Sequence, residues 1–159
     1  MEFKKLPESQ QRVFAQVNNK IDEIRGRSAT IVAALAQRCG EIHTFASAGF
    51  AILVDENGVS AAIKSPIGDG RIALQWAIHD DALVGVLRFE KLCRDEYDGN
   101  FYKLVWALFV PQNEAPYSSK EHVGLKFTSS PYDDDHKANQ FEVLTSVFAA
   151  FADFDLAIK

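Results

Sequence analysis

Cysteine is scarce in this chain of 159 residues, which contains only Cys39 and Cys93. The two residues are far apart and form no CxxC pair, so the common zinc-binding and dithiol motifs are excluded. A single disulfide is one alternative. We expect instead two reduced, partly buried thiols in a cytoplasmic protein.

Long hydrophobic runs and positive charge are also lacking. No uninterrupted apolar run approaches the roughly 18 to 20 residues that a membrane helix requires. Residues 1–5 carry the charge of a signal-peptide start, but the largely polar residues 6–10 follow where an apolar core should be. The net charge of −5 has the wrong sign for nonspecific binding to nucleic acid or anionic lipid. We therefore expect a cytoplasmic protein that binds neither nucleic acid nor membrane.

Motifs that support catalysis or cofactor binding are missing as well. The chain has no P-loop, no G-x-G-x-x-G and no G-x-S-x-G, and its histidines show no HxxxH, HxH or HExxH spacing. The run Asp133–Asp135 lacks the other oxygen ligands and the central glycine of an EF-hand loop, so we expect it to cap a helix. We predict no catalytic residue, no cofactor and no metal.

The N-terminal region has the periodicity of a long helix over residues 8–39. Apolar or small residues recur at spacings of three and four, namely Val13, Val17, Ile21, Ile24, Ser28, Ile31 and Leu35. Gly40 supplies a C-terminal stop. An unbroken helix would be about 48 Å long, longer than a small domain is wide. We expect a break near Gly26, with Ser28 capping a second helix; the alternative is a helix that projects and packs on a partner.

The middle of the chain alternates between apolar and other residues, which is typical of half-buried antiparallel strands. Six strands are predicted, at residues 45–54, 59–64, 71–79, 82–92, 101–110 and 122–128. Asn57-Gly58 is a strong hairpin signal, and a turn there sets Ile52 opposite Ile63. A turn at Asp80-Asp81 sets Trp76 opposite Gly85.

A C-terminal helix is predicted over residues 137–151, where Phe141, Leu144, Phe148 and Phe151 share one face. The expected fold class is therefore α+β. We predict one domain over residues 1–159, built from an N-terminal helix, an antiparallel meander of five to six strands and a C-terminal helix.

The second face of the predicted sheet is unusually apolar. Its middle carries Ala77, Val84, Val86, Val105, Ala107 and Phe109, and its edges are charged. An apolar patch with a polar rim is typical of interfaces and ligand grooves. We expect this face to contact a second copy of the chain in a homodimer, or another protein. The alternative is that the N-terminal helix, or half of it, crosses to this side and covers it.

One end of the sheet gathers polar groups that are candidates for a small site. In a meander, His79, Asp80, Asp81, the Asp55-Glu56 turn and His122 share that end. Two imidazoles with several carboxylates would suit a zinc-type ion or acid–base chemistry. Paired acids in turns are usually only solvated, and we favour that interpretation.

These observations favour a non-catalytic cytoplasmic protein-binding or accessory domain, of the immunity-protein or chaperone type. It would act through the apolar sheet face or the long helix. The alternative is a small-molecule-binding or enzymatic domain, with the ligand on the sheet face under the 111–121 loop. There Gln112, Asn113, Tyr117 and His122 would supply polar contacts.

Overall fold

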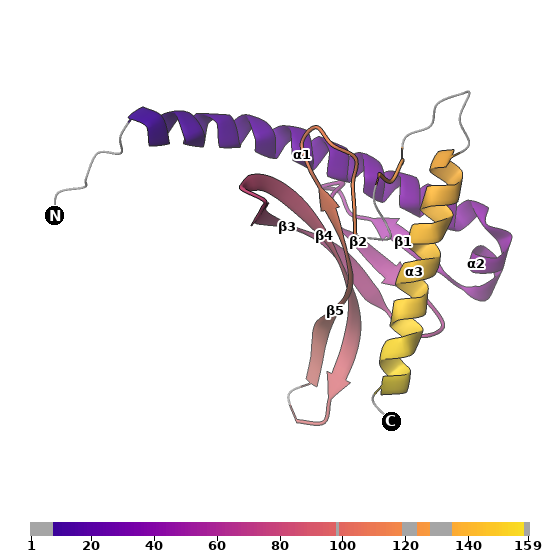
Figure 1. Cartoon of the computed structure of the whole chain (residues 1–159). Helices are drawn as coiled ribbons and strands as arrows, with labels where there is room; N and C mark the ends of the chain where they lie inside the picture. Colours follow the sequence, from indigo (N-terminus) through magenta and orange to yellow (C-terminus); the bar gives the residue numbers. More distant parts are fainter. Residues whose placement is uncertain (1–7, 98, 119–123, 128–134, 158–159) are drawn as a thin grey trace.

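The computed structural model describes residues 8–97, 99–118, 124–127 and 135–157, with the backbone alone for 9–16, 135 and 153–157. Its elements follow the predicted α+β order (Figure 1). They are α1 (Glu8–Glu41), α2 (His43–Ala48), β1 (Ala51–Val54), β2 (Ala61–Lys64), β3 (Gly70–His79), β4 (Ala82–Asp95), β5 (Gly99–Val110) and α3 (Asp135–Ala157). None of the helices in these ranges is long and apolar enough to cross a membrane.

The five strands form one antiparallel sheet in the order β1-β2-β3-β4-β5. The predicted register is confirmed, because Ile52 pairs with Ile63 and Trp76 pairs with Gly85. Asp80 and Asp81 both have positive φ, 50° and 61°, as a two-residue turn of type I′ requires.

The predicted break near Gly26 is wrong, because α1 is one unbroken helix of 34 residues. Gly26 lies on the exposed side of α1, where a glycine costs about 1 kcal/mol and does not end a helix. Ser28 caps nothing and is fully buried. It faces Gly85, where an added Cβ would lie 3.5 Å from the Ser28 hydroxyl and 2.7 Å from Ile24 Cγ2. Two small residues thus bring α1 close to β4.

The strand predicted over residues 45–54 is wrong in its first half. Residues 43–48 form α2, and Gly49 ends it with φ of 93° in the left-handed region. Phe45 and Phe50 pack on α3, with ring centroids 5.2 Å and 4.3 Å from that of Phe148. Aromatic packing between distant segments therefore outweighs the local alternation.

The sixth strand, predicted over 122–128, is not observed where the structure describes that segment. Residues 124–127 are irregular, and Leu125 donates its amide to the Pro116 carbonyl at 3.1 Å. Residues 122, 123 and 128 lie outside the described ranges. The C-terminal helix is longer than predicted, since α3 covers 135–157. Asp133, predicted to cap it, is also outside those ranges.

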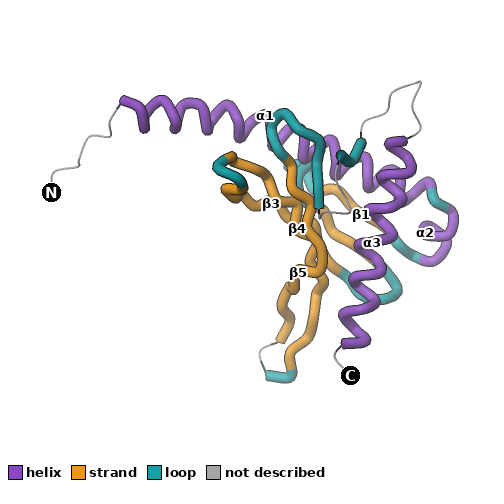
Figure 2. Tube along the Cα trace, viewed as in Figure 1, coloured by secondary structure: helices purple, strands orange, loops and turns teal. Residues whose placement is uncertain are grey.

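Both long helices pack on one face of the sheet, which we call the inner face. Gly85 contacts Ile24 of α1, and a Cβ at Gly70 would lie 2.6 Å from Phe151 of α3. Figure 2 shows α1 crossing the upper end of the sheet and α3 standing beside it. One apolar core results, which includes Ile24, Leu35, Ile63, Leu87, Phe89, Leu108, Val143 and Phe151.

Candidate functional site

The opposite, outer face bears the predicted contact residues, and neither helix covers it. Val84 and Val86 are nonetheless only 3% and 8% exposed. Phe109 lies opposite Val86 in the register, and its ring stacks on Tyr117 at 5.2 Å and on His79 at 5.6 Å. We attribute the burial of the two valines to these three rings, which we call the aromatic cover.

The remaining predicted residues of this face, Ala77, Val105 and Ala107, are half-buried. The described apolar area open to a partner here is therefore smaller than the sequence suggests.

Residues 111–118 are held in place by hydrogen bonds to β5 and to α1. Tyr117 pairs with Phe109 through two backbone hydrogen bonds of 2.7 Å and 3.1 Å. Arg27 of α1 donates to the Pro111 and Glu114 carbonyl oxygens. The segment thereby links the long helix to the aromatic cover.

The polar part of this region centres on the Tyr117 hydroxyl, which lies 2.6 Å from His79 Nδ1. Asp80 approaches the same imidazole nitrogen at 3.7 Å. Burial raises the pKa of Tyr117, and the carboxylates of Asp80 and Glu114 raise it further. The hydrogen bond between Tyr117 and His79 joins two rings of the aromatic cover.

A pocket of about 370 Å³ lies between the aromatic cover and α1. Its polar lining includes Lys20, His79, Asp80, Gln112, Asn113 and Tyr117. The Asp55-Glu56 turn is not in this lining, because β2 pairs only with residues 70–72 at the start of β3. His122 lies outside the described residues. In the parts that are described, no three potential metal ligands come together.

The part of the outer face that surrounds Glu90 is polar. Glu90, whose side chain is 8% exposed, accepts hydrogen bonds from Arg71 at 2.9 Å and Arg88 at 3.4 Å. Arg88 also bonds Gln75 at 2.8 Å, and the Arg71 guanidinium lies 3.7 Å from the centre of the Tyr102 ring. These contacts tie β3, β4 and β5 together through polar side chains.

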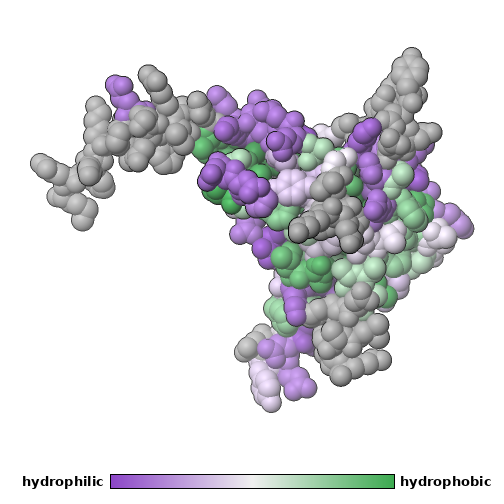
Figure 3. All heavy atoms as spheres, viewed as in Figure 1, coloured by the Kyte–Doolittle hydropathy of each residue, from purple (hydrophilic) through white to green (hydrophobic). Residues whose placement is uncertain are grey.

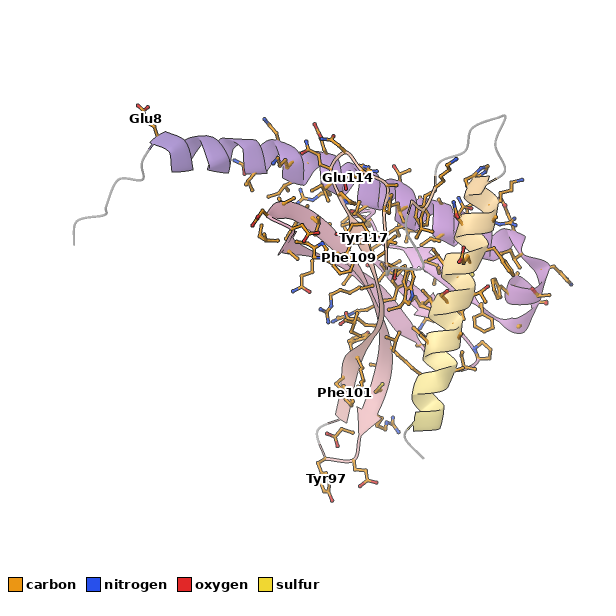
Figure 4. The ribbon with its side chains drawn as sticks, viewed as in Figure 1. Glu8, Tyr97, Phe101, Phe109, Glu114 and Tyr117 are labelled. Atoms are coloured by element: carbon orange, nitrogen blue, oxygen red, sulfur yellow. The ribbon has the colours of Figure 1, made fainter. Side chains whose placement is uncertain are left out.

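Exposed apolar side chains gather instead on the β4–β5 hairpin, which the sequence analysis did not select. Tyr97 is 90% exposed, Phe101 44%, Tyr102 41% and Leu104 43%. Figure 4 shows Tyr97 and Phe101 at the projecting end of this hairpin. The sequence signal that could have identified this surface is that β5 carries large apolar residues on both of its faces.

The N-terminal part of α1 is a second projecting feature (Figure 1). Among the side chains described, Ile24 is the first in α1 that is buried, while Val17 and Ile21 are half-buried and Asn18 is exposed. Residues 8–23, about 24 Å of helix, thus precede the first described side chain of α1 that is buried. Figure 3 shows hydrophilic residues along the outward side of α1 and hydrophobic residues beneath it.

Comparisons of the chain with protein-family models, with curated proteins and with solved structures found no match. Function is therefore inferred from the surfaces themselves.

Proposed function

We propose that this protein is a non-catalytic, protein-binding accessory domain that holds its partner along residues 8–23 of α1. The observation that carries this proposal is that α1 continues unbroken on the N-terminal side of Ile24, the first of its described side chains that is buried. A helix of this length is only marginally stable in water without tertiary packing, and the described side chains of residues 17–23 are at most half-buried. A partner that covers its apolar side would supply that packing.

The residues along this part of α1 support the same proposal. Positions 13, 17 and 21 are four apart and carry Val, Val and Ile. They continue the line of Ile24, which is buried in the domain. Asp22 and Glu23 flank the line and are exposed. An apolar stripe with polar flanks is how a helix engages a groove or another helix.

A partner contact on the outer face of the sheet has less support. The aromatic cover already buries Val84 and Val86, so a partner there would gain little further apolar burial. The proposal accordingly assigns the contact to the helix.

The test is a comparison of Val17→Asp with Asn18→Asp, two substitutions that add the same charge on adjacent positions of α1. Tagged wild-type protein incubated with native host extract should retain a partner. Val17→Asp should lose that partner, and Asn18→Asp should keep it, because Asn18 is exposed and off the apolar line. Circular dichroism should show the same fold in all three proteins.

Hydrogen exchange supplies the second measurement. The amides of residues 9–20 should exchange quickly in the free protein and slowly in the complex, since a frayed helix end gains order on binding. A complex in which these amides stay unprotected, or which survives Val17→Asp, would contradict the proposal.

A second candidate function is the binding of a small molecule, which the pocket of about 370 Å³ favours because its size lies in the range of ligand sites. Ala82 is exposed and lines this pocket, so Ala82→Trp should fill it without disturbing the core. Ligand-observed NMR with a fragment library should then detect hits for the wild-type protein that Ala82→Trp loses. Equal binding to both proteins would exclude the pocket.

A further inference from the structure

β5 is the last strand of the sheet, and part of its outward edge is already covered. Tyr117 pairs with Phe109, and the Ser118 hydroxyl donates to the Ala107 carbonyl at 2.8 Å. Among the described residues, no strand pairs with the outward edge of residues 99–105. This run, which we call the open edge, presents backbone donors and acceptors that a further strand can pair with.

The side chains of the open edge are those of an interface. Phe101, Tyr102 and Leu104 are each more than two-fifths exposed. Natural edge strands are usually short, or protected by charges, prolines or bulges. The open edge carries one charge, Lys103, and its one irregularity is a bulge opposite Phe89 and Glu90, where the pairing shifts from Trp106 to Leu104. The bulge lies at the C-terminal end of the open edge, so the residues before it remain a regular strand that can pair with another.

We propose that two copies of this chain associate through their open edges, forming one continuous antiparallel sheet across a two-fold axis at Tyr102. The contact uses a surface separate from residues 8–23 of α1 and does not depend on the function proposed for them. A two-fold contact must be symmetric about its centre. The open edge runs from residue 99 to residue 105, so the pairing that uses all of it is centred on residue 102.

The chemistry of this register is self-complementary. It sets Phe101 opposite the partner's Lys103, which keeps the two lysines apart and offers each an aromatic neighbour. A register centred on residue 103 would instead set the two lysines directly opposite each other, which is unfavourable. The two Tyr102 rings would meet at the axis, each with Arg71 of its own copy 3.7 Å from the ring centre.

The ends of the contact also fit. In this register the partner's Gly99 comes beside Val105, and Ser118 closes the edge two residues further on, at Ala107. Seven paired residues per copy span about 24 Å, a length typical of strand-to-strand contacts.

Sedimentation velocity over a range of concentrations tests the association. The wild-type protein should form a dimer, and Leu104→Lys should be monomeric, because it replaces an apolar side chain of the contact with a charge in each copy. Ile78→Lys is the matched control. Ile78 is 70% exposed and lies at the far end of β3, so this variant should remain dimeric.

Disulfide trapping tests the register. Position 100 should lie opposite position 104 of the second copy, with Cβ atoms about 5 Å apart. Asn100→Cys mixed with Leu104→Cys should therefore give an oxidised dimer, whereas either variant alone should not. The native Cys39 and Cys93 are buried and should not contribute.

Three results would overturn the proposal: a wild-type protein that is monomeric at every concentration, a dimer that persists in Leu104→Lys, or cross-linking of Asn100→Cys with itself. None of these results would affect the Val17→Asp comparison, so the two proposals fail independently.

Discussion

Gly85 gives the sharpest test of how α1 meets the sheet. A Cβ at this position would lie 2.7 Å from Ile24 Cγ2, 3.1 Å from Leu74 Cδ1 and 3.5 Å from the Ser28 hydroxyl. The first distance is shorter than carbon atoms tolerate, and Ile24 is fully buried with its helix fixed along the sheet. We therefore expect Gly85→Ala to push α1 away from β4.

The magnitude follows from the size of the overlap. One methyl group forced into a packed core costs about 1 to 3 kcal/mol. The contact with Ile24 puts Gly85→Ala in the upper half of that range, at about 2 to 3 kcal/mol. Urea denaturation followed by circular dichroism should show this loss, and the melting temperature should fall by about 3 °C per kcal/mol for a chain of this size.

Gly26→Ala is the matched control, since a Cβ there meets nothing within 4 Å. An exposed helical glycine changed to alanine should stabilise the protein by about 0.5 to 1 kcal/mol. Ile24→Leu removes the Cγ branch that collides, so the double variant Gly85→Ala/Ile24→Leu should be more stable than the sum of the two single changes predicts. A cost below about 0.5 kcal/mol for Gly85→Ala, within the usual range for harmless changes, would refute the close approach of α1.

Three further predictions concern the core and the aromatic cover. Phe148→Ala should cost about 3 to 5 kcal/mol in urea denaturation, because Phe148 is 5% exposed and holds α2 against α3; a smaller loss would mean that α2 packs loosely. Tyr117→Phe should reduce the loss of stability at alkaline pH. The folded state holds the pKa of Tyr117 above its ordinary value near 10, so the free energy of unfolding of the wild-type protein should fall as pH rises through that value. The variant lacks this phenol and should show a smaller fall. Burial raises the pKa of the Cys39 thiol, so iodoacetamide should label Cys39 slowly in the native protein and fully in urea; rapid native labelling would contradict its burial.

The strand pairing could be predicted from the sequence because short turns determine it. Asp80-Asp81 leaves only one two-residue hairpin, and from it the pairing of Trp76 with Gly85 follows by counting. Counting from a two-residue turn at Asn57-Gly58 also gave the pairing of Ile52 with Ile63, although the turn itself spans residues 56–59, which share the same centre. Local turn chemistry and a period of two carry this information without any knowledge of distant contacts.

Two of the errors in secondary structure have a common cause. The helix was expected to break at Gly26, and residues 45–50 were expected to be strand. In both places a contact with a distant segment decided the outcome: Ser28 packs over Gly85, and Phe45 and Phe50 pack on Phe148. Such contacts are not visible in a local pattern, and they routinely outweigh propensity.

The surfaces were predicted in part. The sequence pattern placed Val84, Val86 and Phe109 together on the outer face, which is their position in the register. It did not reveal that Tyr117 returns to pair with Phe109, because a pairing across a loop that contains Pro111 has no short turn to signal it. Nor did it identify the open edge, since whether a strand is central or terminal depends on how the whole sheet is assembled.

The position of the proposed contacts separates binding from folding. Residues 8–23 of α1 precede Ile24, the first described side chain of that helix that is buried, and the open edge belongs to the last strand of the sheet. Charged substitutions at Val17 or Leu104 should therefore abolish contacts while leaving unfolding in urea nearly unchanged, because neither side chain belongs to the buried core. Substitutions in the core, such as Gly85→Ala, should act on unfolding first and on partner contacts only through the fraction unfolded. A domain whose binding depended on the aromatic cover would show the opposite pattern, with stability and binding lost together.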